Sequence, residues 1–305
     1  MRKMNRRGLI TTLLGICSPL LGAFSCEERE LMAQLVDRSD HDKLKEPVQG
    51  LQRGKLGPHE ISRLIIGGNL ISGSAHAGEL LYQSALMAHY FTTEKILETW
   101  ALAEQNGINT TLMRADPHIF EHYRRFTHER GGKLHWIAQS APEQGDPVEN
   151  GKRARDHGAI GIYLHGGVSD KMVKDGRVEE IGRIVEGFRK AGLMGGVGAH
   201  HLPTVEACTR AGLDPDFFMV TVNRKEYTSS PAGEVAAFMK TIRRPWIGFK
   251  VLGAGRDTPL EGFQHAFEKG ADFVAVGMFD WQVRDDSAYV QALLAQGVTR
   301  ERTWA

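Results

Sequence analysis

Residues 159–166 read AIGIYLHG, an apolar run of strand-forming residues that ends on a histidine and a glycine. Amphipathic segments separate this run from others like it, and glycine or proline marks most boundaries. Strands that alternate with helices in this way predict a parallel sheet. The other runs are RLIIGGN (63–69), GINTTLMR (107–114), KLHWIAQ (133–139), MGGVGAHH (194–201), FFMVTVNR (217–224), WIGFKVLG (246–253) and DFVAVGMF (272–279).

Eight strand–helix units in about 240 residues predict a (β/α)8 TIM barrel, for which roughly 250 residues are typical. The barrel is expected over residues 51–305, with a short hairpin before it and a long loop after its first strand. A doubly wound sheet is the alternative, but Gly67-Gly68-Asn69-Leu70 is not the glycine-rich fingerprint that usually follows the first strand of such a sheet. The predicted helices span 92–105, 117–130, 146–157, 177–191, 203–211, 232–242, 259–269 and 285–296.

The composition is that of a soluble globular chain of 305 residues, with 41% hydrophobic and 25% charged residues. The 38 basic and 37 acidic residues give a net charge of +1, so no global field directs the protein to nucleic acid. A small molecule is therefore the expected partner, and nothing indicates an oligomeric state. Cys17, Cys26 and Cys208 are too few for a disulfide framework, whereas thirteen histidines are plentiful.

Residues 1–26 have the pattern of a bacterial signal peptide, a basic start followed by an uncharged apolar stretch over 9–24. Asn5-Arg6-Arg7-Gly8-Leu9-Ile10 resembles a twin-arginine export signal, and a Sec signal is an equal alternative. Small residues favour cleavage before Cys26 and a periplasmic or secreted protein. Lipidation at Cys26 is less favoured and is the only expected route to a membrane. Residues 27–50 are rich in charge and predict an arm or linker.

Strand alternation in a barrel predicts which side chains face its interior. It places Ile160, Ile162 and Leu164 outward, and Tyr163 and His165 inward. It also places Ile247, Phe249 and Val251 outward, and Gly248 and Lys250 inward. Because the active site of such barrels lies at the carboxyl ends of the strands, we expect a polar mouth there. Its members are Asn69, Gln139, His165, His200, Asn223 and Lys250, with Arg114 and Asp116 just past the second strand.

Three segments resemble the aldo/keto reductase superfamily in their order and spacing. They are 51–57 with 61–64 and Gly67-Gly68, then 103–109, then Val276-Gly277-Met278 with Gln282-Val283. The resemblance implies an NAD(P)-dependent reductase barrel that uses an aspartate, a tyrosine, a lysine and a histidine. Leu112, Pro117 and Gln139 stand at the first three positions, and only His165 matches. Because ketone reduction of this kind needs a phenol and a nearby cation, the resemblance indicates a divergent member or a scaffold without catalysis.

His165, His200 and Asp116 are the candidate ligands of a divalent metal at the mouth. Imidazoles with a carboxylate suit Zn²⁺, Mn²⁺ or Fe²⁺ and leave a position for substrate. The alternative is that these histidines only form hydrogen bonds in a polar mouth.

Lys250, His165 and Arg114 are the candidate catalytic residues. A lysine within an apolar strand loses hydration, which lowers its pKa and suits it as a general base or as an imine-forming amine. A salt bridge to Asp280 or Asp116 is the alternative. Arg114 is suited to stabilise an enolate, although an arginine after a strand often forms a structural ion pair.

Two loops carry the remaining candidates. Gly253, Gly255 and Arg256 follow the seventh strand, where barrels often hold phosphate and where the resembled family holds the cofactor's pyrophosphate. The insert over 72–91 contributes Tyr82 and Tyr90, whose rings suit a sugar. With Asn69, Gln139 and Asn223, these tyrosines form the predicted substrate-binding set.

Three functions remain open. The first is an exported enzyme that performs non-redox acid–base chemistry, as an isomerase, epimerase or lyase, on a small polar substrate such as a sugar, with or without a metal. The second is an NAD(P)-dependent oxidoreductase, in which His165 donates a proton. The third is a barrel that binds a ligand without catalysis.

Overall fold

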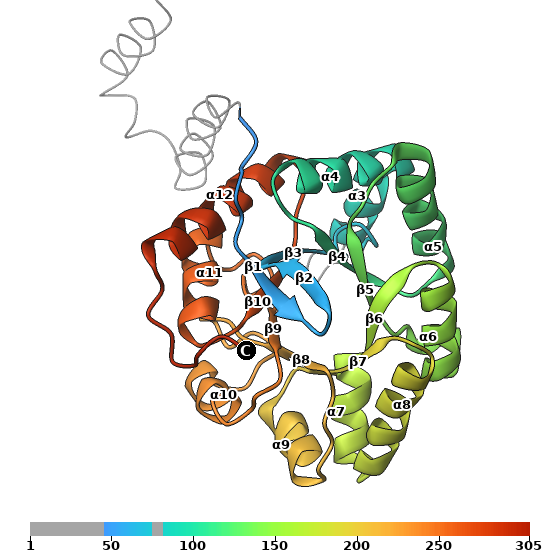
Figure 1. The fold of residues 1–305 in the computed structure, drawn as a ribbon, viewed down its shortest axis with the longest axis vertical. Coiled ribbons are helices and arrows are strands. Elements are labelled where there is room, and N and C mark those ends of the chain that lie inside the picture. Colours follow the sequence, from blue (N-terminus) through green and yellow to red (C-terminus); the bar gives the residue numbers. More distant parts are fainter. Residues whose placement is uncertain (1–45, 75–81) are drawn as a thin grey trace, which may run out of the picture. The chain divides into compact units, whose positions relative to one another are not determined.

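Eight parallel strands close into a barrel in the order β10-β3-β4-β5-β6-β7-β8-β9, which confirms the predicted fold class (Figure 1). The computed structural model describes residues 46–74 and 82–305, so the predicted signal peptide and most of the predicted arm lie outside the described residues. The strands are β3 (Leu64–Gly67), β4 (Thr110–Arg114), β5 (His135–Gln139), β6 (Ala159–Leu164), β7 (Met194–Ala199), β8 (Phe217–Thr221), β9 (Trp246–Phe249) and β10 (Phe273–Gly277).

A helix follows each strand and packs on the outside of the barrel (Figure 1). These helices are α4 (Thr93–Gln105), α5 (Pro117–Arg124), α6 (Pro147–Asp156), α8 (Val178–Lys190), α9 (Leu202–Arg210), α10 (Ala232–Met239), α11 (Pro259–Glu268) and α12 (Asp280–Gln296). Within the described residues, no helix is both long and apolar enough to span a membrane.

The helices differ from the prediction in several places. A further helix, α7 (Gly166–Lys174), precedes α8, and α12 begins five residues before the predicted start at 285. The predicted helix 117–130 changes at Arg125 into a π-helix, η1 (Arg125–Glu129), and a short 3-10 turn, η2 (Pro142–Gln144), precedes α6. The long loop after β3 contains α3 (Gln83–Tyr90). Sequence pattern missed α7 because the segment opens with two glycines, which usually indicate a loop.

The predicted hairpin closes the amino-terminal end of the barrel. It consists of β1 (Arg53–Leu56) and β2 (His59–Ser62), which pair antiparallel. Leu56 and Ile61 are fully buried in the same cluster as Met194 and Phe217 of the barrel interior. The opposite end, where the strands finish, is therefore the end that is open to a ligand.

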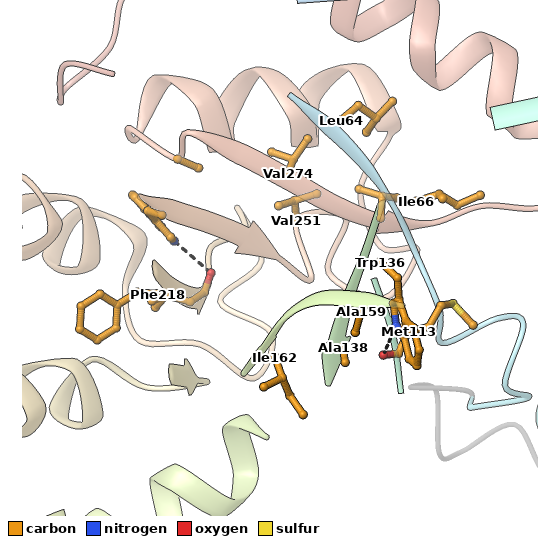
Figure 2. Packing of buried hydrophobic residues seen from close by; sticks show 14 of the residues in the cluster. Leu64, Ile66, Met113, Trp136, Ala138, Ala159, Ile162, Phe218, Val251 and Val274 are labelled. Atoms are coloured by element: carbon orange, nitrogen blue, oxygen red, sulfur yellow. Dashed lines mark hydrogen bonds between the residues drawn. The ribbon is translucent and has the colours of Figure 1, made fainter. Parts of the chain in front are cut away.

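Two apolar clusters stabilise the barrel. The inner cluster takes residues from every strand, while the outer cluster lies between the strands and the helices. Figure 2 shows part of the outer cluster, where the indole of Trp136 donates to the carbonyl of Met113 at 3.2 Å. Cys208 is fully buried in this layer, and burial raises the pKa of its thiol to about 12. It is thus a core residue, because a thiol that stays protonated is a poor nucleophile.

Strand alternation predicted the wrong facing for residues in two strands, β6 and β9. Ile160 packs against the inner cluster because a register shift opposite Trp136 and Ile137 inserts one extra residue there. Ile247 and Phe249 also face inward, in register with inner residues of β10, so the outward prediction for both was wrong. A side chain at Gly248 would meet Val222 and Ala271 of the outer cluster.

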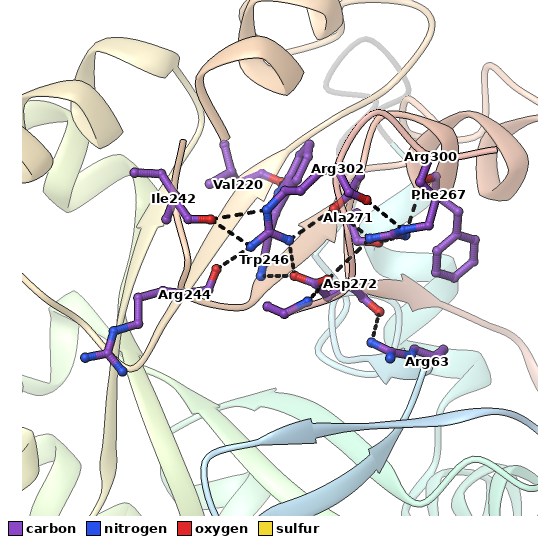
Figure 3. Close-up of polar contacts among 12 residues, drawn as sticks. Arg63, Val220, Ile242, Arg244, Trp246, Phe267, Ala271, Asp272, Arg300 and Arg302 are labelled. Carbon is purple, nitrogen blue, oxygen red and sulfur yellow. Dashed lines mark hydrogen bonds and ion pairs between the residues drawn. The ribbon is translucent and has the colours of Figure 1, made fainter. Parts of the chain in front are cut away.

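A buried ionic cluster holds the segment after α12 against the amino-terminal end of β10 (Figure 3). Asp272 is fully buried, and its carboxylate accepts hydrogen bonds from Arg302 at 2.5 Å, Arg300 at 3.3 Å and the backbone of Trp246 at 2.9 Å. The carbonyl of Asp272 accepts from Arg63. Asp272, Arg300, Arg302 and Arg63 thus each have a counter-charge or a carbonyl, which buried ions require.

Candidate functional site

A cavity of about 400 Å³ opens at the carboxyl ends of the barrel strands. This is where barrel enzymes carry their active sites. Among its lining residues are seven that the sequence singled out for the mouth, for catalysis or for a cofactor, namely Asn69, Arg114, Gln139, His165, His200, Lys250 and Gly255. Leu112, Tyr163, Phe249 and Phe279 also line it.

Other predicted residues do not line this cavity. Asn223 is fully buried, and its amide binds the backbone of Tyr227 in both directions, at 2.8 and 3.0 Å. The side chain of Tyr82 is 77% exposed. Tyr90 donates to Asp280 at 2.5 Å and packs edge-on against Phe279, so it supports the cavity wall from behind.

His200 is held by a carboxylate that sequence reasoning missed. Its Nδ1 lies 2.9 Å from Asp170 of α7, and its backbone N–H donates to the same carboxylate. Asp170 also accepts from the hydroxyl of Thr204 at 2.6 Å. Burial raises the pKa of Asp170, but the hydrogen bonds from His200 and Thr204 outweigh it and lower the pKa overall. An ionised Asp170 fixes the proton on Nδ1, which leaves Nε2 of His200 as a base.

Two glycines allow α7 to bring Asp170 to this position. A Cβ at Gly198 would lie 2.7 Å from the carbonyl oxygen of Leu164 and 2.8 Å from the backbone nitrogen of Gly166. A Cβ at Gly166 would lie 3.0 Å from the ring of His200. The close approach of α7 to β7 therefore requires small residues at both positions.

His165 directly precedes α7 as its N-cap residue and lies beside His200, with 6.3 Å between the ring centroids. Its backbone N–H donates to Ser140 at 3.0 Å, whereas its Nδ1 is buried and has no hydrogen-bond partner among the described residues. Burial lowers the pKa of His165 to about 4, helped by the charges of His200, Arg114 and Lys250, while the charge of Asp170 acts in the opposite direction. The imidazole is therefore neutral at pH 7, ready to relay a proton.

Lys250 reaches the cavity by a strained backbone rather than by strand alternation. It follows β9 with φ of +54°, a left-handed conformation that costs a residue with a side chain about 1–2 kcal/mol. Its Nζ lies 5.8 Å from the ring centroid of Tyr227 and 5.9 Å from that of Phe249. Burial lowers the pKa of Lys250 to about 8. Of the two predicted ion-pair partners, Asp280 pairs with Lys95 and Asp116 pairs with Arg114.

The guanidinium of Arg114 is held by two carboxylates, Asp116 at 3.1 Å and Glu143. Asp116 also lies 2.8 Å from Nδ1 of His118, and it is absent from the cavity lining. The positive charge of Arg114 is therefore largely neutralised where it borders the cavity, which suits a neutral polar substrate better than an anion.

Tyr163 also lines the cavity, although the prediction did not select it as a site residue. Its side chain lines the cavity on the inner face of β6. Burial raises its pKa well above the ordinary range, while the charge of Arg114 acts in the opposite direction. Strand alternation placed Tyr163 inward, but a tyrosine within an apolar run is first interpreted as a core residue.

The predicted metal ligands come together only in part. His165 and His200 share the cavity, whereas the carboxylate of Asp116 serves Arg114 and His118. Over residues 46–74 and 82–305, no three His, Cys, Asp or Glu side chains are grouped to hold an ion. These donors do not make a complete site, so no step below is assigned to a metal, and the metal stays a prediction.

The predicted phosphate loop, residues 253–256, contributes Gly255 to the cavity lining, but not the side chain of Arg256. Gly255 lines the cavity with φ of +80°, and a Cβ there would meet nothing within 4 Å. Arg256 instead places its guanidinium 4.3 Å from the ring centroid of Tyr227 and donates to the carbonyl of Gly253 at 3.0 Å. The loop residues thus offer one open glycine but no arginine directed at a pyrophosphate.

Solved structures with a similar barrel include aldo-keto reductases. A candidate aldo-keto reductase from Pseudomonas aeruginosa has a TM-score of 0.60 at 18% identity, covering 83% of this chain and 98% of that chain. The chain has the aldo-keto reductase barrel fold. An aldo-keto reductase from Bacillus halodurans, in its holo form, has a TM-score of 0.54 at 12% identity, covering 80% and 92%. No protein-family profile matches the sequence, and a search of curated proteins finds no match.

Three positions at which the resemblance implies catalytic side chains lie together on the cavity, but two of them carry other residues. Leu112, Gln139 and His165 all line it, at the positions where the resemblance implies an aspartate, a lysine and a histidine. Pro117 begins α5 and offers no hydroxyl. The site therefore has a different set of proton donors and acceptors from the one that the resemblance implies.

Proposed function

We propose that this protein is an enzyme that moves a proton next to the carbonyl group of a small polar substrate, as an isomerase, epimerase or lyase. The observation that carries the proposal is the His200–Asp170 pair, which directs a basic nitrogen into the same cavity as Lys250. A base and a cation on one small cavity are what enolisation requires, because the proton and the developing oxygen charge must both be received.

In the proposed reaction, Nε2 of His200 takes the proton from the carbon next to the carbonyl. Asp170 stabilises the imidazolium that results, since it already binds Nδ1. The ammonium of Lys250 stabilises the enolate oxygen, and Gln139 and Asn69 offer amides to the substrate hydroxyls. Return of the proton to the other face gives an epimer, and return to the neighbouring carbon gives an isomer.

The test is deuterium incorporation at the carbon next to the carbonyl, followed by NMR in D2O with a panel of small hydroxyketones and aldoses. Exchange should depend on His200 and fall about 10²–10⁴-fold in His200→Gln, the range of general-base catalysis. The variant His201→Gln is the matched control, because His201 is exposed and absent from the cavity lining. Exchange that survives His200→Gln unchanged would contradict the proposal.

An NAD(P)-dependent reductase is the second candidate, favoured by the shared fold and by the open backbone at Gly255. Here Tyr163 would donate the proton to the carbonyl oxygen, since its side chain lines the cavity. Titration of the purified protein with NADPH and NADH, followed by nicotinamide fluorescence, separates the two candidates. Saturable binding favours the reductase. A protein that neither exchanges deuterium nor binds nucleotide, but is stabilised by a sugar, is a binding barrel.

A further inference from the structure

We propose that Lys250 forms an imine with the carbonyl carbon of a small ketone or aldehyde bound in the barrel cavity. This inference rests on the proposed function, because it states how the same site holds a carbonyl substrate. It makes Lys250 a covalent participant, where simple enolisation needs it only as a cation.

The backbone at Lys250 gives the first argument. Phe249 faces the barrel interior, so regular alternation would turn the next side chain outward, yet Lys250 lines the cavity. The left-handed turn at φ of +54° makes this possible, and its carbonyl accepts from Gly253 at 2.8 Å to hold the turn. Ala254, which also lines the cavity, has a left-handed backbone as well, with φ of +60°. Strain that is kept at Lys250, whose side chain is long and charged, indicates that the position of this side chain matters for function.

The surroundings of the amine give the second argument. Its Nζ has the rings of Phe249 and Tyr227 within 6 Å, and Met219, Val251, Leu252 and Ala275 add apolar lining to the cavity. Poor hydration favours the neutral amine, and burial lowers its pKa to about 8. Roughly a tenth of the Lys250 side chains are then neutral nucleophiles at pH 7, far more than of an ordinary lysine.

The neighbouring histidines give the third argument, because imine formation needs groups that move protons. The neutral amine attacks the carbonyl carbon, the C=O pair moves to oxygen, and a proton passes from nitrogen to that oxygen. The C–O bond then breaks, water leaves with the second amine hydrogen, and the nitrogen lone pair completes the C=N bond. His165, neutral and with no hydrogen-bond partner at Nδ1 among the described residues, is placed to relay these protons. His200 can then take the neighbouring carbon-bound proton.

The experiment traps the imine by reduction. The full-length protein is incubated with hydroxyacetone, glyceraldehyde or pyruvate in the presence of sodium cyanoborohydride, which reduces an imine to a stable secondary amine. We expect one adduct per chain, heavier by the carbonyl compound less one oxygen, and peptide mapping should place it on Lys250. The adduct should form faster as the pH rises through about 8, the pKa of Lys250.

Two variants make the assignment specific. Lys250→Arg keeps the charge but should form no adduct, while circular dichroism reports that it folds. Lys225→Met is the matched control, because Lys225 is an exposed lysine in the neighbouring loop, and its adduct yield should equal that of the wild type. Equal labelling of Lys225 and Lys250, or no adduct with any of the three carbonyl compounds, would overturn the imine.

Deuterium exchange measured in the same samples separates this inference from the proposed function. Exchange without an adduct overturns the imine and leaves the proton-transfer enzyme in place. An adduct without exchange supports the imine and contradicts the proposed proton transfer. Absence of both contradicts both.

Discussion

At the residue scale, the two histidines of the cavity differ because their neighbours differ. His200 has a carboxylate on Nδ1, whereas the Nδ1 of His165 has no hydrogen-bond partner among the described residues, and burial lowers the pKa of His165 to about 4. A carboxylate therefore orients the ring of His200 so that its Nε2 can act as a base, whereas no carboxylate holds the ring of His165 at Nδ1 among the described residues. Asp170 makes this difference, and it touches no part of the cavity itself.

We therefore predict that Asp170→Asn lowers deuterium exchange or turnover by about 10²-fold, the lower end of general-base catalysis. An asparagine cannot stabilise the imidazolium, so kcat should fall more than KM rises, and the pH profile should shift with it. Asp175→Asn is the control, since Asp175 ends the same helix and pairs with the exposed Lys171. A change in KM alone would show that Asp170 only shapes the cavity.

The sequence predicted most of the charged and amide residues of the cavity because they follow strands whose ends converge. It could not predict Asp170, which acts from a helix through a contact 30 positions away in the chain. Asn69 and Gln139 line the cavity, while Asn223 binds a turn instead. Alternation gives the direction of a side chain, but it does not say whether the nearest partner is a ligand or the chain's own backbone.

At the element scale, two local backbone features place side chains where strand alternation alone does not predict them. Glycines at 166 and 198 let α7 begin against β7, and the left-handed turn at Lys250 reverses the facing that β9 imposes. Both are backbone effects that a pattern of apolar residues does not contain. Strand existence was predicted for all eight barrel strands, because buried parallel strands are continuous apolar runs.

The inner face of α12 carries an acid whose ionisation should destabilise the fold. Asp286 is 2% exposed, its Oδ2 has no partner among the described residues, and burial raises its pKa to about 7. In the unfolded chain this pKa is near 3.8. Between pH 4 and 7 the folded state thus binds more protons than the unfolded state, so this residue makes stability fall as pH rises.

Asp286→Asn should remove this pH dependence. We expect the variant to match the wild type near pH 4.5 and to exceed its free energy of unfolding by on the order of 2–4 kcal/mol at pH 8. Urea unfolding at both pH values measures this difference. Asp285→Asn, one residue away, removes a neighbouring charge but leaves the buried carboxyl of Asp286. Its increase in unfolding free energy at pH 8 should therefore be smaller than that of Asp286→Asn. Parallel pH curves for wild type and Asp286→Asn would refute the assignment.

At the scale of the whole molecule, the residues that stabilise the barrel and the residues of the candidate site lie at opposite ends of it. The hairpin and the Asp272 cluster close the amino-terminal end, and the cavity occupies the other. We predict that Arg302→Met costs about 3–5 kcal/mol of unfolding free energy, the effect of breaking a buried ion pair. Arg302 also donates to the carbonyls of Ile242 and Arg244, which would lose their partner.

The exposed Arg243 provides the control for this prediction, and Arg243→Met should change stability by less than about 0.5 kcal/mol. Denaturant unfolding measures both variants. Deuterium exchange per folded molecule should be unaffected by either, because both positions lie at the end opposite the cavity. Equal stability of the two variants would show that the cluster contributes nothing.

Export is a prediction for the whole chain that rests on its sequence alone. If residues 1–26 direct twin-arginine export in a bacterial host, Arg6→Lys with Arg7→Lys should retain the protein in the cytoplasm, whereas Sec export should continue. The mature protein should begin at Cys26, which the mass of the periplasmic chain measures. A chain that keeps its first residue and stays in the cytoplasm would refute export.

The Asp272 cluster also sets an order on biosynthesis. Asp272 leaves the ribosome before Arg302, which follows thirty residues later and supplies its main counter-charge. Until then, a closed barrel would bury an acid with too little compensation, so the nascent chain should remain open and sensitive to protease up to that point. A ribosome stalled before Arg300 would hold an unfinished barrel, and release of the following residues would complete it.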